Sequence, residues 1–216
     1  MLPLPPRAEL RRRLPRLLGG LVLFGVAIAC LVRADLGLPP WDVLHQGVAE
    51  RTGLAIGTAS IIVGVVVLLL WIPLRERVGV GTVANALIVG LVIDATMSVV
   101  DTPASTVGRV GLLVLGIVLF GPGSGLYIGA GLGPGPRDGL MTALARRGRS
   151  VRVVRTAIEL TVLAIGVALG GSVGIGTVAF AVTVGPNVHL FLDRMKFAPP
   201  ETRPPTTPAL GTFEPL

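Results

Sequence analysis

The feature that most constrains this chain is an internal repeat with an offset of about 95 residues. Residues 34–42 read ADLGLPPWD and recur as AGLGPGPRD at residues 130–138. Residues 79–84 read GVGTVA and recur as GIGTVA at residues 174–179. The two offsets, 96 and 95, differ by one residue, so both matches belong to a single alignment. A duplicated apolar unit is typical of membrane proteins that have a pathway between their two halves.

The composition indicates that lipid is the solvent. Hydrophobic residues make up 51% of the chain and charged residues only 14%, against roughly 25% in an average soluble domain. The formal net charge is +7, but the basic residues form short clusters between apolar segments. That pattern marks membrane topology rather than a nucleic-acid-binding surface. We therefore predict an all-α membrane protein whose partner is the lipid bilayer and that binds no nucleic acid.

Six segments approach the length of about 20 apolar residues that a helical crossing requires. We predict six transmembrane helices at residues 17–32, 54–74, 78–100, 107–130, 153–169 and 173–192. The repeat assigns three of them to each of two membrane units, at residues 17–100 and 107–196. The remaining segments are an arginine-rich N-terminus, an external linker and a disordered Pro- and Thr-rich tail, at residues 1–16, 101–106 and 197–216.

Three crossings per repeat place the second copy in the membrane in the opposite orientation to the first. The charges agree with this expectation, because basic residues alternate between the copies at equivalent positions. Five arginines precede the first span, whereas residues 101–108 hold none; Arg75 and Arg77 follow the second span, whereas residues 170–172 hold none. Conversely, residues 137–152 after the fourth span are rich in arginine. The positive-inside rule then predicts two inverted repeats with both termini in the cytoplasm.

Each repeat carries a short segment after its first span, at residues 40–52 and 136–147. About 12 residues, at a rise of 1.5 Å each, reach only about 18 Å, which is too short to cross. An interfacial helix and a re-entrant half-helix both remain open. Asp42 and Asp138, two residues after the starting prolines, are candidate ion or substrate contacts. The alternative is that each acid only stabilises the N-terminus of its helix.

Three ionisable residues lie within the apolar spans, where they are costly and often functional. Asp94 lies in the third span, Glu159 in the fifth and His189 in the sixth, and we take them as candidates for a solute or proton pathway. The repeat aligns Asp94 with His189, whereas Glu159 aligns with a glycine. The alternative is that Asp94 and His189 reach the headgroups and that Glu159 pairs with Arg155 one turn earlier.

Glycines recur at every fourth position near the end of the fourth span, which predicts a smooth face for close helix packing; they are Gly121, Gly125, Gly129 and Gly133. The sequence holds no Ser/His/Asp set, no His-Glu-x-x-His motif and no Cys/His cluster. We therefore expect no enzymatic activity, no catalytic residue, no metal site and no cofactor. Cys30 is the single cysteine, so no intramolecular disulfide forms.

The repeated motif also resembles a known family. Its residues read LGLPPWDVLHQG at 36–47, GTAS at 57–60, GVGT at 79–82 and GLGPGPRDGLM at 131–141. They resemble the YczE/YyaS/YitT family of bacterial integral membrane proteins, most of all its YczE-like branch. The resemblance extends over residues 17–196 and implies a bacterial inner-membrane location. It implies no substrate and no catalytic residue.

Two functional hypotheses follow from the sequence. The first is a small transporter-like permease that moves a small solute or proton between inverted repeats and acts as a homodimer. The second is a membrane protein that transports nothing and is a partner or regulator of another system, since a fold by itself does not decide function.

Overall fold

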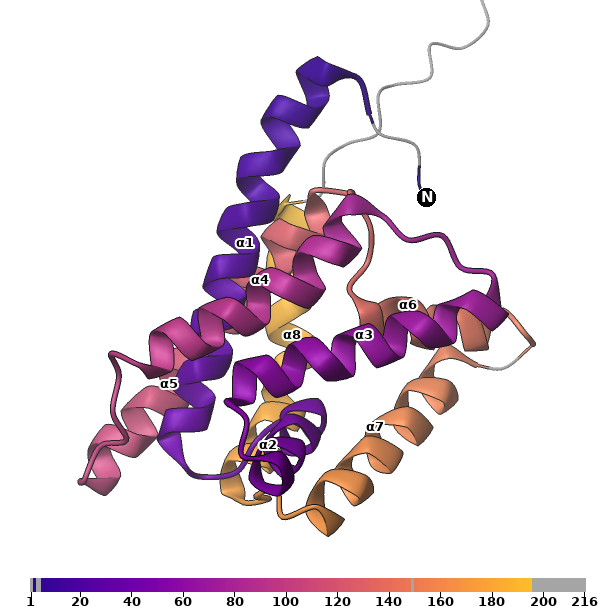
Figure 1. The fold of residues 1–216 in the computed structure, drawn as a ribbon. Helices are drawn as coiled ribbons and strands as arrows, with labels where there is room; N and C mark the ends of the chain where they lie inside the picture. The colour runs from indigo at the N-terminus through magenta and orange to yellow at the C-terminus, as the bar shows by residue number, and fades with distance from the viewer. Residues whose placement is uncertain (1, 3–4, 149, 196–216) are drawn as a thin grey trace, which may run out of the picture.

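The computed structural model describes residue 2, residues 5–148 and residues 150–195; the predicted tail at 197–216 lies outside this part of the chain. The described residues form eight α-helices and no strand (Figure 1). The helices are α1 (Arg7–Ala34), α2 (Pro40–Thr52), α3 (Ile56–Leu74), α4 (Val80–Met97), α5 (Thr106–Gly129), α6 (Pro136–Ala145), α7 (Val151–Ala168) and α8 (Ile175–Met195). The all-α prediction is confirmed, and each predicted span falls on one helix.

Five helices are long and apolar enough to cross a membrane, namely α1, α3, α4, α5 and α8. The sixth predicted span, α7, has 18 residues but is not among these five. It carries three charged residues, Arg152, Arg155 and Glu159, whereas the apolar window of each candidate span holds two at most. The short predicted segments form α2 and α6, each with proline in its first turn, where the missing N–H costs nothing.

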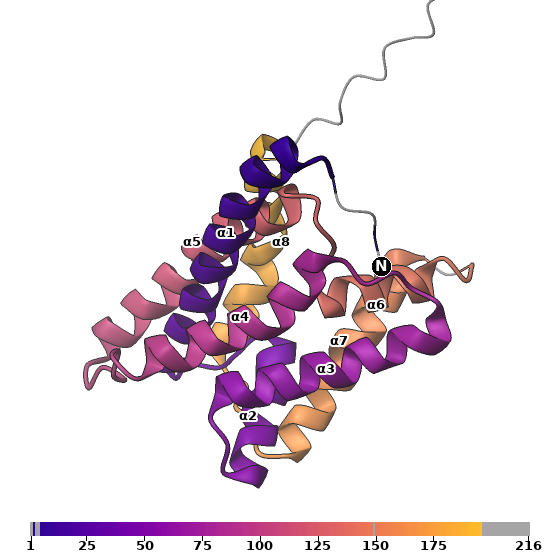
Figure 2. The ribbon, with the colours of Figure 1, turned by 45° about the horizontal axis from the view of Figure 1, so that its top comes forward.

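The centre of the molecule is the pair α1 and α5, which pack along each other. The rings of Phe24 and Phe120 lie 4.5 Å apart between them. Glycines permit the close approach: an ideal Cβ on Gly20 would lie 2.5 Å from the backbone nitrogen of Tyr127. Helix α4 packs on α1, and α8 packs on α5 (Figures 1 and 2). The start of α1 and the end of α8 lie at the same end of this bundle.

The glycine face of α5 lies toward α8. Cβ atoms on Gly121 and Gly125 would collide with Asn187 and Phe191 of that helix. Gly129 is buried in the last turn of α5. The inclusion of Gly133 in this face is wrong, because α5 ends before it and its φ of +127° belongs to a loop that glycine adopts without strain.

The two repeated motifs hydrogen-bond to each other across the repeats. The backbone N–H of Gly81, at the start of α4, donates to the carbonyl of Leu132 at 2.8 Å. At the equivalent position, the N–H of Gly176 at the start of α8 donates to the carbonyl of Leu36 at 2.7 Å. Each loop after a first span therefore anchors the last span of the other repeat.

The remaining helices lie beside the central bundle. Helix α2 packs on α7, α3 packs on α6, and each short helix also packs on the following helix of its own repeat. One equivalent pair differs: α3 packs along α4, whereas α7 and α8 barely touch. A Cβ on Gly90 of α4 would lie 2.5 Å from Ile61 of α3, but a Cβ on the equivalent Gly185 of α8 would meet nothing within 4 Å.

Candidate functional site

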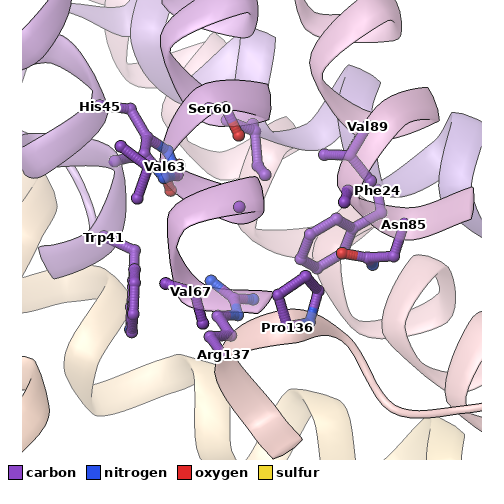
Figure 3. Close-up of a pocket in the computed structure, with 14 residues that line it drawn as sticks. Phe24, Trp41, His45, Ser60, Val63, Val67, Asn85, Val89, Pro136 and Arg137 are labelled. Atoms are coloured by element: carbon purple, nitrogen blue, oxygen red, sulfur yellow. Dashed lines mark hydrogen bonds and ion pairs between the residues drawn. The ribbon is translucent and has the colours of Figure 1, made fainter. Parts of the chain in front are cut away.

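Two cavities flank the short helices near the middle of the central bundle. The cavity that we call the small cavity lies among α1, α2, α3, α4 and α6, measures about 50 Å³ and includes Phe24, Asp42, Ser60, Gly64 and Asn85 (Figure 3). The cavity that we call the large cavity lies among α2, α5, α6, α7 and α8, measures about 280 Å³ and includes Phe120, Asp138, Arg155, Glu159 and Phe180. The large cavity is close to the volume of roughly 300 Å³ at which small-molecule sites begin.

The same positions of the two repeats line the two cavities. The alignment pairs Phe24 with Phe120, Asp42 with Asp138, Ser60 with Arg155, Gly64 with Glu159, and Asn85 with Phe180. Two further equivalent residues, Trp41 and Arg137, line both cavities. The molecule therefore carries one cavity design twice, with different side chains and a different volume in each copy.

Trp41 and Arg137 approach the small cavity from different helices, each from the residue after a starting proline (Figure 3). Trp41 is 6% exposed, and its Nε1 is buried without a hydrogen-bond partner among the described residues. The Arg137 guanidinium lies 5.3 Å from the centroid of the Phe24 ring and 5.8 Å from that of Phe120. It forms no hydrogen bond or ion pair with the part of the chain that the structure describes. Both rings contribute to the stabilisation of its cation.

The carboxylates around Arg137 are bonded to other groups. Tyr127 donates from its hydroxyl to Asp138 Oδ2 at 2.8 Å, and Arg155 donates from Nε to Glu159 at 2.8 Å. Asp42, the third carboxylate, is 1% exposed, and only one of its two oxygens has a hydrogen-bond partner among the described residues.

Asp42 Oδ1 lies 3.2 Å from Nδ1 of His45, one turn later on α2. Asp42 Oδ2 is buried with no hydrogen-bond partner among the described residues. A buried carboxylate oxygen without a donor is costly, so this oxygen calls for a water or a ligand in the small cavity.

The charge of Arg137 is secure despite its position. Burial lowers the pKa of its guanidinium, but the negative charge of Asp138 and of more distant groups raises it by more, so the net pKa is above its ordinary value. Arg137 is therefore a permanent cation at the junction of the two cavities.

The difference in volume follows from the residues on α3 and α7. In the small cavity Ser60 and Gly64 leave room for α4, and a Cβ on Gly64 would lie 3.6 Å from Cβ of Ala86. At the equivalent positions α7 carries Arg155 and Glu159, whose long side chains form an ion pair that lines the large cavity. These charged side chains occupy the space through which α7 would pack on α8.

The sequence-derived candidates divide into two groups. Glu159, His189 and Asp138 line the large cavity, and Asp42 lines the small one. Asp94 lines neither. Its carboxylate accepts from the backbone N–H of Gly57 at 2.7 Å and from the Thr58 hydroxyl at 3.0 Å, which places it as a cap on the first turn of α3.

The geometry of the other acids agrees with a contact to a solute and also with a purely structural role. Glu159 pairs with Arg155 one turn earlier and also lines the large cavity. The side chains of Asp42 and Asp138 lie in the first turns of α2 and α6, but their hydrogen bonds go to His45 and Tyr127. The cavity role of these acids stays a prediction.

The sequence pattern did not point to the two central residues. Arg137 was counted among the basic residues that mark the cytoplasmic side, whereas its side chain lies against two rings inside the molecule. The signal was its position in the repeat, where Arg137 replaces Trp41 between proline and aspartate. Within the described residues, no group of three or more His, Cys, Asp or Glu side chains could hold a metal ion.

Comparisons with known proteins place the chain in a family. "Family of unknown function (DUF6198)" matches residues 11–193. An "Uncharacterized protein" of Haemophilus influenzae is 39% identical over 178 residues, which cover 82% of each chain. "Uncharacterized membrane protein YczE" of Bacillus subtilis is 35% identical over 170 residues, covering 77% of this chain and 79% of the relative. "Uncharacterized protein YyaS" of the same organism is 25% identical over 178 residues, covering 80% and 89%. No solved structure matches the chain.

Proposed function

We propose a function from the premise that this chain belongs to the DUF6198 family and, with its relatives YczE and YyaS, fits the YczE-like branch that the motif indicates. The chain is a multi-pass membrane protein. Our proposal is that it is a small permease, and that its solute passes between two inverted repeats through the junction of the two cavities.

The inverted arrangement is supported by equivalent contacts. The bonds from Gly81 to Leu132 and from Gly176 to Leu36 exchange places when the repeats are exchanged. The same holds for the packing of α4 on α1 and α8 on α5, and of α3 on α6 and α7 on α2. In Figure 1, α1 and α5 run in opposite directions, as do α4 and α8. A two-fold axis in the membrane plane relates elements in this way.

The position of α2 and α6 favours re-entrant over interfacial helices. Their first residues line the cavities together with Phe24 and Phe120, which lie near the middle of the predicted first and fourth spans. The far ends of the short helices contact the distant ends of other helices: Arg51 donates to the carbonyl of Leu169, and Arg146 pairs with Glu76. Broken helices whose N-termini face a midplane site are a recurrent design of transporters.

The observation that carries the proposal is the pair of equivalent cavities, one small and one large. Alternating access in inverted repeats exchanges the conformations of the two halves around a fixed site. Here that exchange would move α7 onto α8 and move α3 away from α4. Trp41 and Arg137 face both cavities and would contact the solute in either state.

The remaining features complete the proposal. Helix α7 serves as the sixth crossing, with Arg155 and Glu159 on the large cavity. An even number of crossings agrees with α1 starting and α8 ending at the same end of the bundle, which we assign to the cytoplasmic side of a bacterial inner membrane. The protein catalyses no reaction, and its assembly as a homodimer stays a prediction.

The test is flux into liposomes that contain the purified protein. Proton movement is followed with an enclosed pH-sensitive dye, and uptake is measured for a panel of radiolabelled anions, cations and neutral solutes of fewer than about 15 heavy atoms, a size suited to a small pocket. We expect uptake of at least one solute. Glu159→Gln should reduce it at least about tenfold by removing a charge from the cavity, whereas the exposed Glu50→Gln should leave it unchanged.

Lack of flux across the whole panel, with one other protein co-purifying in stoichiometric amount, would contradict the permease. That result would favour the hypothesis of a membrane partner or regulator.

A further inference from the structure

We infer that Arg137 binds an oxyanion, the carboxylate or phosphate group of the transported solute, at the junction of the two cavities. The inference rests on the proposed permease and names the chemical class of its substrate. It depends on which hydrogen-bond donors and acceptors around the junction already have a partner within the described residues and which do not.

The donors at the junction are free. Arg137 carries five N–H groups and forms no hydrogen bond or ion pair with the described residues, and its guanidinium lies over the rings of Phe24 and Phe120. Trp41 Nε1, 6% exposed and without a partner among those residues, lies on the same two cavities. An acceptor placed between Trp41 and Arg137 would satisfy both groups.

The acceptors in the large cavity are already engaged. Asp138 accepts the hydroxyl of Tyr127, and Glu159 is paired with Arg155. Arg137 is therefore the charged group of the large cavity that has no ion-pair partner within the described chain. A solute that brings a negative group gains a charge-assisted bond there, whereas a cation is repelled by Arg137. The buried carboxylate oxygen that has no donor among the described residues, Oδ2 of Asp42, belongs to the lining of the small cavity and not of the large one.

The junction also receives the N-terminal ends of two helices of ten or more residues. Trp41 is the second residue of α2, and Arg137 is the second residue of α6. Both helices therefore direct the positive ends of their dipoles toward the cavities. Asp42 and Asp138 in the first turns offset this effect in part. The free donors on Trp41 and Arg137 then favour a negative group over a positive one at the junction.

Guanidinium geometry defines the ligand further. Its planar fork matches the two oxygens of a carboxylate or phosphate, and a lysine in its place would keep the charge but lose the fork. The large cavity of about 280 Å³ presents Phe120 and Phe180 beside Arg137, which suits a solute with an apolar body and one oxyanion. A lipid headgroup phosphate entering between α7 and α8 has the same chemistry.

The experiment measures binding rather than flux, by calorimetry on the full chain in phosphatidylcholine nanodiscs. Benzoate, benzamide and benzylammonium have nearly the same shape and differ in charge, and inorganic phosphate is the fourth probe. We expect benzoate and phosphate to bind at least about tenfold more tightly than the neutral and cationic probes, since only they pair with Arg137.

Variants identify the residue. Arg137→Gln should weaken benzoate binding at least about tenfold, and Arg137→Lys should weaken it less while preserving the preference for anions. Arg147→Gln, which makes the same change at an exposed position just beyond α6, should have no effect. If Arg137→Gln does not fold, the Lys variant and Trp41→Phe supply the same comparison through weaker benzoate binding.

The two sources of the oxyanion are separated by repeating the titration in phosphatidylglycerol nanodiscs, with both lipids measured at a salt concentration that screens the surface charge. An unchanged benzoate affinity supports a soluble solute, and a reduced affinity supports a competing lipid phosphate. Equal binding of benzamide and benzoate, or benzoate binding by Arg137→Gln at wild-type strength, would overturn the inference. Flux without anion binding would contradict the oxyanion site but not the permease. Anion binding without flux would contradict the permease but not the oxyanion site.

Discussion

The small cavity and the large cavity occupy equivalent positions in the two repeats, and they differ where α3 differs from α7. In the first repeat Ser60 and Gly64 allow α3 to pack along α4, and the cavity between them is about 50 Å³. In the second repeat Arg155 and Glu159 stand at those positions, α7 is separate from α8, and the cavity is about 280 Å³. Two pairs of equivalent residues, Ser60 with Arg155 and Gly64 with Glu159, thus distinguish the small cavity from the large one.

A second contrast between the repeats shows how the scaffold tolerates different side chains. Trp71 of α3 packs on Gly139 of α6, where an added Cβ would lie 2.0 Å from the indole ring. At the equivalent contact Gly166 of α7 packs on the backbone of Val43 in α2. The large and small partners have exchanged helices, so both interfaces are filled. Duplication fixes the contacts between helices, and later substitutions change what the contacts enclose.

The largest expected difference between the two repeats is in disulfide formation, tested in a Cys30→Ala background. Gly64→Cys with Ala86→Cys should oxidise almost completely, because the two Cβ atoms lie about 3.6 Å apart, within the range that a disulfide requires. Thr156→Cys with Gly185→Cys, across α7 and α8, should oxidise little, since nothing approaches Gly185 within 4 Å. The measurement is the fraction of protein that resists thiol labelling after oxidation.

Adding Arg155→Ser and Glu159→Gly to the second pair sharpens this comparison. These changes give α7 the small residues of α3, so the disulfide yield across α7 and α8 should rise several-fold as the helices approach. Equal yields for the two pairs without these additions would contradict the packing of α3 on α4 and the separation of α7 from α8, as would no response to the additions.

The next effect concerns the loops that cross between repeats, where both copies should respond alike. Gly37 and Gly133 have φ of +101° and +127°, and an added Cβ would lie 2.3 Å from the nitrogen of Gly174 or 2.7 Å from Thr82 Oγ1. Gly37→Ala and Gly133→Ala should each lower the free energy of unfolding by roughly 3 kcal/mol or more, from backbone strain plus collision. Denaturant unfolding in detergent micelles is the measurement.

Gly53→Ala is the control for strain alone. Gly53 has φ of +72° but open space around its Cβ position, so its substitution should cost only about 1 kcal/mol. If Gly37→Ala proved no worse than Gly53→Ala, the contact between the loop and the start of α8 would not contribute to stability.

The smallest effect separates Asp94 from His189, its equivalent in the repeat. Asp94→Ala leaves the N–H of Gly57 and the hydroxyl of Thr58 without their acceptor, and should lower the free energy of unfolding by about 1–3 kcal/mol. His189→Ala removes a side chain that lines the large cavity and should cost less than about 0.5 kcal/mol. Thermal unfolding of the purified variants, followed by circular dichroism, gives both values; a larger cost for His189 would assign it the structural role instead.

The helices themselves could be predicted from the sequence because their signals are local. Runs of apolar residues gave every long helix, and the prolines at 40 and 136 gave the starts of α2 and α6. The charge of α7 gave an ambiguous signal, because Arg155 and Glu159 are each costly in an apolar segment, whereas the structure pairs them with each other on the same helix. The glycines of the repeat were visible as a pattern, but that Gly81 bonds to Leu132 is a contact between distant segments that no local signal carries.

The candidate site was predictable only in part for the same reason. Glu159, His189 and Asp138 were found because an ionisable group in an apolar segment is conspicuous by itself, and the structure brings them to one cavity. Asp94 has the same local signal but caps α3. Arg137, in contrast, has no distinctive local signal, because in the sequence it is one of several arginines in a basic loop.

The sequence alone determined that this is a helical membrane protein built from two copies of one unit, because hydropathy and repetition are properties of the chain read in order. Tertiary structure alone decided that Trp41 and Arg137 line the same two cavities and that α7 lies apart from α8. Those outcomes depend on which side chains face each other across the repeats, and the packing of the whole molecule sets that pairing.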